Sequence, residues 1–214
     1  YGPKGIKEII TLQLKLAKSW TDYQLNFHEL SSNISQTIYS KDNISVKTLP
    51  LKHRIYTNGF LFTSTSSSRK INSTVIQGLN LKPFHFDQLK KGLSIKLEDG
   101  TKIKNTELTL DPDKPKSYAY CSDTAYFKEL VPLINQVDLL YHESTFLEKD
   151  VILAEKTKHS TAIQAAKIAK DAKVKKLILG HYSNRYKDKE NFFKEASSVF
   201  KNVELSEDLK TFLV

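Results

Sequence analysis

Three short apolar segments of this chain each end on a residue that can bind a metal ion or move a proton. They span residues 117–123, 137–143 and 176–181. Each is rich in aliphatic and aromatic residues and too short for a helix, which is typical of a buried β-strand. The segments end on Asp123, Glu143 and His181. Ligands of layered α/β proteins bind at the carboxyl ends of the strands, so we expect these three side chains to enter one cleft.

Helical patterns alternate with these strands. Residues 161–172 are rich in alanine, and Thr161 with Gln164 forms a capping box that fixes the start of a helix. Further helices are predicted from 6 to about 19, at 125–135 with a break or kink near Pro132, and at 189–200, and extended segments at 23–30, 34–39 and 44–51. The alternation of strands and helices predicts an α/β layered fold.

The segment 63–116 differs in composition from the rest of the chain. It opens on a serine-rich run at 64–68, and it closes on the proline-rich run 111–115. Loop-forming runs at both ends of a segment indicate an inserted, less tightly packed arm. Within this arm, residues 94–97 and 102–108 are expected to form a small hairpin. We therefore divide the chain into a core part at 1–62, the arm at 63–116 and a second core part at 117–214.

Composition narrows the class of protein. The chain has 214 residues, of which 39% are hydrophobic, and no run of about 18 apolar residues, so we expect a real core and no membrane span. Its single cysteine, Cys121, lies in an apolar run, which favours a packed thiol and a reducing compartment. The stretch 149–189 carries +7 of the net charge of +9, which favours a polyanionic partner such as nucleic acid.

Five residues are candidates for the chemistry. His53, Asp123 and His181 each end an extended segment, and together they form a mixed nitrogen and oxygen set suited to zinc, with Asp123 able to bridge two ions. His159 precedes the helix capped by Thr161, where the helix dipole disfavours a charged imidazole. A carboxylate partner would restore that charge, and Glu143 is the natural candidate for a proton-transferring pair. His142, one residue before Glu143, is expected to face the other side of the strand and to make a structural hydrogen bond.

The order of several short motifs resembles the ribonuclease Z family. The motifs are Tyr-Gly-Pro-Lys-Gly-Ile at 1–6, Lys-His-Arg-Ile at 52–55, Cys-Ser-Asp-Thr at 121–124, His-Glu-Ser-Thr-Phe at 142–146, His-Ser-Thr-Ala at 159–162 and Gly-His-Tyr-Ser-Asn-Arg-Tyr at 180–186. The resemblance covers essentially the whole chain. It implies a metallo-β-lactamase-like αββα sandwich with an inserted flexible arm. It also implies a cytoplasmic, homodimeric, zinc-dependent endoribonuclease that removes 3′ trailers from precursor tRNA.

The resemblance also assigns roles to individual residues. His53 would bind one zinc ion, His181 the other, and Asp123 both, while Glu143 and His159 would aid departure of the tRNA 3′ oxygen. The two ions would polarise the scissile phosphate and hold the attacking hydroxide. Three basic residues would meet RNA phosphates: Arg185 near the cut, and Lys90 and Lys91 on the arm.

Two departures from the family pattern keep alternatives open. A His-x-His-x-Asp-His motif, which the family carries ahead of Tyr1, is not in this sequence, so we expect this chain alone to bind zinc poorly and to cut nothing. A Gly-Pro step often found in the arm is replaced by the sequence at 81–84. The alternatives are a phosphodiesterase of the same fold acting on small molecules, and a metal-free RNA-binding or dimer-partner module.

Overall fold

The computed structural model of the chain describes residues 1–65 and 68–214 and separates into two compact units. The first unit comprises Tyr1–Ser40, Ser45–Phe62 and Ser117–Val214, and the second comprises Lys41–Ile44 and Thr63–Lys116. Ser66 and Ser67, part of the serine-rich run that opens the predicted arm, lie outside the described residues.

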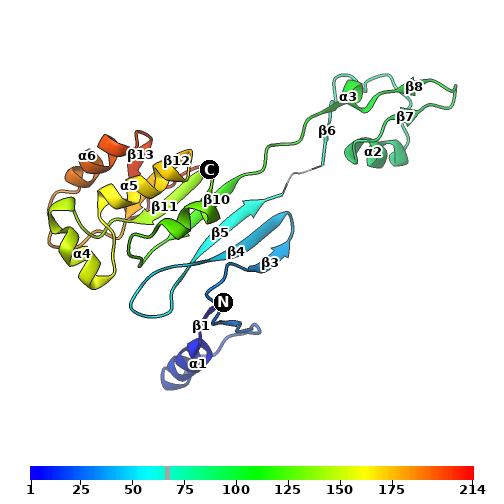
Figure 1. Cartoon of the computed structure of the whole chain (residues 1–214). Helices are drawn as coiled ribbons and strands as arrows, with labels where there is room; N and C mark the ends of the chain where they lie inside the picture. The colour runs from blue at the N-terminus through cyan, green and yellow to red at the C-terminus, as the bar shows by residue number, and fades with distance from the viewer. Residues whose placement is uncertain (66–67) are drawn as a thin grey trace. The chain divides into compact units, whose positions relative to one another are not determined.

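A seven-stranded sheet carries the strands predicted from the apolar segments (Figure 1). Its order is β13-β12-β11-β10-β5-β4-β3, with bounds Val203–Leu205, Lys176–Gly180, Leu139–Glu143, Ser117–Cys121, Asn58–Ser64, Ile44–Pro50 and Thr37–Lys41. Strands β10, β11, β12 and β13 are parallel to one another. The three predicted apolar strands are β10, β11 and β12, which confirms those predictions and brings their carboxyl ends to one edge of the sheet.

Helices pack against the parallel strands. α5 (Ala162–Asp171) contacts β11 and β12, and α6 (Glu190–Val199) contacts α5 and β13 (Figure 1). The capping box is present: the Oγ1 of Thr161 accepts the Gln164 N–H at 3.2 Å, and the Gln164 side chain accepts the Thr161 N–H at 3.0 Å. Both predicted helices are confirmed. The short helix α4 (Val151–Thr157) was not predicted.

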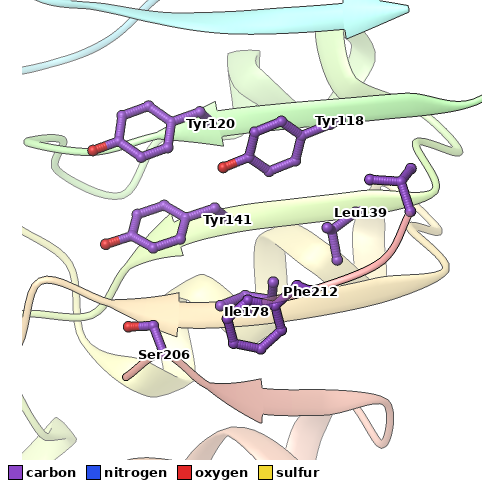
Figure 2. Close-up of a pocket in the computed structure, with 8 residues that line it drawn as sticks. Tyr118, Tyr120, Leu139, Tyr141, Ile178, Ser206 and Phe212 are labelled. Atoms are coloured by element: carbon purple, nitrogen blue, oxygen red, sulfur yellow. The ribbon is translucent and has the colours of Figure 1, made fainter. Parts of the chain in front are cut away.

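The two faces of the parallel strands differ because side chains alternate along a strand. Ala119, Leu140 and Leu179 are fully buried in the core cluster that includes residues of α5 and α6. Their sequence neighbours face the other way. There, in Figure 2, Tyr118, Tyr120, Leu139, Tyr141 and Ile178 line a cavity of about 390 Å³ together with the C-terminal Ser206, Phe212 and Val214.

The core holds the single cysteine. Cys121 is fully buried, and its burial raises the pKa of the thiol, so the prediction of a packed thiol is confirmed. None of the helices in the described parts of the chain has the length and apolar content that crossing a bilayer requires.

Some local predictions are wrong. The segment 23–30 is irregular apart from β2 (Glu29–Leu30), which pairs with β1 (Gly2–Pro3). The segment 125–135, predicted to be helical with a break or kink near Pro132, contains a 3-10 helix, η1 (Lys128–Ile134), rather than a kinked α-helix, because Pro132 inside it lacks the N–H that a regular α-helix needs. Helix α1 (Ile6–Leu16) stops short of Ser19, since Lys18 has a left-handed backbone with φ 51°.

The second unit has a small core of its own, despite the loose packing expected from its sequence. Its elements are β6 (Lys70–Ile71) paired with β9 (Thr109–Leu110), the predicted hairpin β7 (Ile95–Lys96) with β8 (Lys102–Ile103), and the helices α2 (Pro83–Lys90) and α3 (Asn105–Leu108). Leu89, Ile95 and Leu108 are buried at its centre. The buried Asn105 amide donates to the carbonyls of Leu89 and Leu93 at 2.8 and 3.1 Å, which ties the helices to the connecting loop.

Candidate active site

Five predicted side chains lie together at the carboxyl ends of the parallel strands. Asp123 follows β10 by two residues, Glu143 ends β11, and His181 directly follows β12. His159 comes from the connection between α4 and α5, and its ring lies 5.2 Å from that of His181 and 5.0 Å from that of His53. The Nε2 of His181 is 3.5 Å from a carboxylate oxygen of Asp123. The structure therefore brings these residues from distant parts of the sequence into one cluster.

The backbone at this cluster is unusual. Asp123 and His181 both have φ 58°, and Lys158, which precedes His159, has φ 61°. A left-handed conformation is uncommon for residues other than glycine and costs on the order of 1 kcal/mol or more. At Asp123 and His181 the backbone thus departs from the strand conformation, and the two side chains lie 3.5 Å apart in the cluster.

Glu143 is fully buried and accepts hydrogen bonds on both carboxylate oxygens. Its Oε1 accepts from the Thr124 N–H and from the Nδ1 of His159, both at 2.7 Å. Its Oε2 accepts from the Thr145 hydroxyl at 2.6 Å, the Ser160 N–H at 3.1 Å and the Thr145 N–H at 3.3 Å. Burial alone would raise the pKa of Glu143, but these donors outweigh it and the pKa is lowered, so the carboxylate is ionised.

His159 is held by that carboxylate. The hydrogen bond to Glu143 raises the pKa of His159, against the opposing effect of partial burial. This pairing offsets the unfavourable position of an imidazolium just ahead of helix α5. Because Nδ1 is bound to Glu143, the Nε2 of His159 is the ring atom available to a ligand in the cleft.

The Nδ1 atoms of the other two histidines are also occupied. The Nδ1 of His53 is 2.9 Å from the Lys158 carbonyl, and the Nδ1 of His181 is 2.8 Å from the Thr145 hydroxyl. All three rings thus have Nδ1 bound to a neighbouring group, and the Nε2 of His181 lies 3.5 Å from the Asp123 carboxylate. A metal-binding histidine commonly has its second nitrogen held in this way.

Two residue groups place their donor atoms close enough to hold a metal ion. They are His53 with Asp123 and His159, and Glu143 with His159 and His181, with all donor atoms of a group within 4.8 Å of one another. Distance alone overstates the role of Glu143, because both of its oxygens already accept hydrogen bonds. The donor atoms that remain for an ion are the Asp123 carboxylate and the Nε2 atoms of the imidazoles, a set that fits a divalent transition metal.

The remaining predicted residues lie elsewhere. The Arg185 guanidinium is half exposed, 3.9 Å from Asp150 and 5.7 Å from the ring of Phe146. Lys90 and Lys91 are exposed at the end of α2 in the second unit. Their predicted contacts with RNA stay predictions.

The other three histidines of the chain have contacts outside the cluster's donor set. His142 is buried, and its Nδ1 donates to the Glu143 carbonyl at 2.7 Å, which confirms the expected structural hydrogen bond. His28 stacks on the ring of Tyr1, and the buried His85 accepts the Lys82 N–H at 3.1 Å.

Several groups that shape the site escaped the sequence analysis. The Thr145 hydroxyl, the Lys158 carbonyl and the N–H groups of Thr124 and Ser160 all bind the candidate residues. A signal existed only for Thr145, which lies two residues after Glu143 and shares its side of the chain by strand alternation. The backbone groups depend on long-range folding and leave no mark in the sequence.

Comparison with known proteins places the chain in a family. Residues 73–182 match the model of the beta-lactamase superfamily domain. The chain is 42% identical to ribonuclease Z of Cytophaga hutchinsonii over 215 residues, covering all of this chain and 68% of the relative. It is 38% identical to ribonuclease Z of Bacteroides fragilis, covering 97% of this chain and 68% of the relative.

Solved structures show the same fold. The short form of human tRNase Z superposes with a TM-score of 0.60 at 20% identity, covering 98% of this chain and 65% of that one. The metallo-beta-lactamase fold protein YhfI from Bacillus subtilis superposes with a TM-score of 0.58 at 14% identity, covering 96% of this chain and 61% of that one. The chain thus spans about two thirds of the length of its relatives, and the predicted metallo-β-lactamase fold is confirmed.

Proposed function

The chain belongs to the ribonuclease Z family of the beta-lactamase superfamily, and from this premise we propose that the protein is a zinc-dependent endoribonuclease that removes 3′ trailers from precursor tRNA. The observation that carries the proposal is the buried Glu143 carboxylate, which accepts from the Nδ1 of the partly buried His159 at 2.7 Å, close to the partly exposed Asp123 carboxylate. A proton donor next to a set of metal ligands suits metal-assisted phosphodiester hydrolysis.

The proposed metal ligands are His53, Asp123 and His181. His53 and His181 would each present Nε2 to one of two zinc ions, and Asp123 would serve both. When bound, zinc supplies Lewis-acid polarisation of the scissile phosphate. The protein's own contribution is to fix the ligands: the Lys158 carbonyl and the Thr145 hydroxyl contact the Nδ1 atoms of the two imidazoles and so orient the rings.

Glu143 and His159 are the proposed proton-transfer pair. The leaving group is the 3′ oxygen of the tRNA, which departs as an alkoxide unless it receives a proton. The Nε2 of His159 would donate that proton, while the Glu143 carboxylate stabilises the imidazolium through Nδ1. General acid catalysis of this kind typically contributes about 10²- to 10⁴-fold to the rate.

Basic residues away from the cluster supply the proposed RNA contacts. The +7 stretch at 149–189 includes Arg185, which is half exposed, and Lys90 and Lys91 are exposed on the second unit. Contacts of this type with phosphates weaken as salt rises. A homodimer and a cytoplasmic location are part of the proposal and rest on the family resemblance alone.

The test is cleavage of a precursor tRNA with a labelled 3′ trailer by the complete gene product that contains this chain. Asp123→Ala and His159→Ala should each lower the rate at least about 100-fold, since each removes a group acting on the scissile phosphodiester or its leaving group. His28→Ala, which alters a ring stacked on Tyr1 outside the cluster, is the matched control. Parental rates in both site variants would refute the assignment.

A second assay separates tRNA processing from small-molecule hydrolysis. Replacing Lys90 and Lys91 by alanine should weaken tRNA binding in a salt-dependent way and leave hydrolysis of an aryl phosphodiester unchanged. Equal effects on both substrates, or hydrolysis of the small substrate alone, would favour the small-molecule phosphodiesterase.

A further inference from the structure

We propose that Thr145 is a positioning residue: its hydroxyl fixes the tautomer of His181 and couples that histidine to the Glu143–His159 pair. Thr145 lies just after β11, in the loop between the strand and η2 (Glu148–Asp150), and its side chain is almost fully buried at 7% exposure. Its importance to metal binding rests on the proposed function, since it presumes that the Nε2 of His181 is a ligand.

The Thr145 hydroxyl has three polar neighbours. It lies 2.6 Å from the Oε2 of Glu143, 2.8 Å from the Nδ1 of His181 and 3.3 Å from the Nδ1 of His159. A hydroxyl donates one hydrogen and accepts through two lone pairs. The three contacts therefore allow only a few arrangements of protons.

The contact with Glu143 determines where the hydroxyl hydrogen lies. An ionised carboxylate can only accept, and two oxygen atoms 2.6 Å apart need a hydrogen between them. The Oε2 atom also accepts the N–H groups of Ser160 and Thr145, which favours the ionised form of Glu143. The hydroxyl hydrogen therefore points to Glu143.

The contact with His181 must then run in the opposite direction. With its only hydrogen on Glu143, the hydroxyl accepts from His181, so the Nδ1 of that ring carries hydrogen and the Nε2 carries a lone pair when the ring is neutral. The His159 contact adds nothing to this choice, because its Nδ1 hydrogen is directed to the nearer Oε1 of Glu143 at 2.7 Å.

This tautomer is the one that metal binding needs. The Nε2 of His181 lies 3.5 Å from a carboxylate oxygen of Asp123, so in this tautomer two electron-pair donors lie close together. The other tautomer would place hydrogen on Nε2 and require its removal before coordination. The Thr145 hydroxyl thus makes hydrogen bonds both to His181, a proposed metal ligand, and to Glu143 of the proposed proton-transfer pair.

The first test reads the tautomer directly and needs neither tRNA nor metal. Long-range ¹H–¹⁵N NMR spectra of the His181 ring are recorded on the ¹⁵N-labelled full-length protein, in chelator, at a pH where the ring is neutral. The wild-type ring should carry its hydrogen on Nδ1. A ring with hydrogen on Nε2 would overturn the proposal, whatever the variants do and whether or not the protein cleaves tRNA.

The variants test whether Thr145 is the cause. Thr145→Val keeps the shape and removes the hydroxyl, so the ring should become a mixture of tautomers and zinc affinity should fall about 10-fold or more. Thr145→Ser restores the hydroxyl and should restore the Nδ1 tautomer and affinity to within about 3-fold of wild type. Thr157→Val, an exposed threonine on α4, controls for the substitution itself.

The outcomes separate this inference from the proposed function. A folded Thr145→Val protein with the wild-type tautomer and wild-type zinc affinity would refute the role of Thr145. If Thr145→Val does not fold, failure of Thr145→Ser to keep the Nδ1 tautomer would refute it equally. Loss of zinc binding in the wild type would contradict the proposed metal site and leave the tautomer result standing.

Discussion

Glu143→Gln tests the hydrogen-bond network that organises the site. The carboxylate accepts five hydrogen bonds, two on Oε1 and three on Oε2, and it is fully buried. Glutamine offers one accepting oxygen and one NH₂ group that can only donate. At least one N–H that now points to a carboxylate oxygen must therefore face another N–H.

The two orientations of the glutamine differ in cost. With NH₂ in place of Oε2, the N–H groups of Ser160 and Thr145 both lose their acceptor. With NH₂ in place of Oε1, only the Thr124 N–H loses its acceptor. The Nδ1 of His159 keeps a partner, because it can give up its hydrogen and accept a hydrogen bond from the NH₂ group. The second orientation should prevail, with the His159 hydrogen on Nε2.

The free energy follows from that orientation. One buried N–H without an acceptor costs about 1–3 kcal/mol, and the charge-assisted hydrogen bonds that become neutral lose about 1 kcal/mol more. Relief from burying a charge offsets part of this sum. We expect the free energy of unfolding to fall by about 2–3 kcal/mol, which in a chain of this size lowers the melting temperature by roughly 5–10 °C.

Urea unfolding monitored by circular dichroism measures this change, with Glu8→Gln on the exposed surface of α1 as the matched control. NMR amide exchange tests the orientation: the Thr124 amide should exchange faster in Glu143→Gln, and the Ser160 amide should stay protected. An unfolding midpoint equal to that of the control would refute the energy argument. Faster exchange at Ser160 with protection at Thr124 would refute the proposed orientation.

Three further predictions concern the scaffold around the site. Gly59→Ala should lower the free energy of unfolding by at least about 2 kcal/mol in urea titrations, because the new Cβ would lie 2.4 Å from the carbonyl oxygen of Tyr120, and backbone cannot yield as a side chain can. Thr161→Ala removes the N-cap of α5 and should cost about 1 kcal/mol in the same assay, where no change would argue against the capping box. The pKa of Asp138 is lowered, since hydrogen bonds from its neighbours, the Lys175 ammonium first among them, outweigh its burial. The ionised Asp138 contributes its full stabilisation of the fold above the pKa of an unfolded aspartate, about 4, and this contribution is lost as pH falls through the lower folded-state pKa. Below about pH 4 the free energy of unfolding of the wild type should therefore fall more than that of Asp138→Asn. Equal falls in the two proteins would contradict this prediction.

The strands that carry the site were predictable because their signals are local. A parallel strand covered on both faces is apolar along its length, and each of β10, β11 and β12 has this pattern just before a polar residue. Helix α5 was predictable for the same kind of reason, since Thr161 and Gln164 mark its start in four residues. Where the local signal was ambiguous, as in the tyrosine- and leucine-containing segment 23–30, the prediction of a strand was wrong.

The positions of the candidate side chains follow from features that the sequence does not display. Asp123 and His181 turn into the cleft through left-handed backbone conformations, and neither residue type marks such a position by itself. His53 gains its orientation from the carbonyl of Lys158, 105 residues away along the chain. Such contacts exist only after the sheet and helices have packed, so residue types could suggest the members of the site and not the groups that hold them.

The three imidazoles of the cluster share one arrangement, and its origin bears on how the site works. Each has its Nδ1 bound to a different kind of group: a backbone carbonyl for His53, a carboxylate for His159 and a hydroxyl for His181. Because three different kinds of partner all bind Nδ1, we infer that the common feature of functional value is an Nε2 atom directed away from the partner. Two of these orienting groups belong to Lys158, which has a left-handed backbone, and to Glu143, which is the buried carboxylate. The packed scaffold itself therefore orients the rings of the site. Loss of one orienting group should therefore disturb its own histidine most, which is why the hydroxyl of Thr145 and the carboxylate of Glu143 can be tested separately.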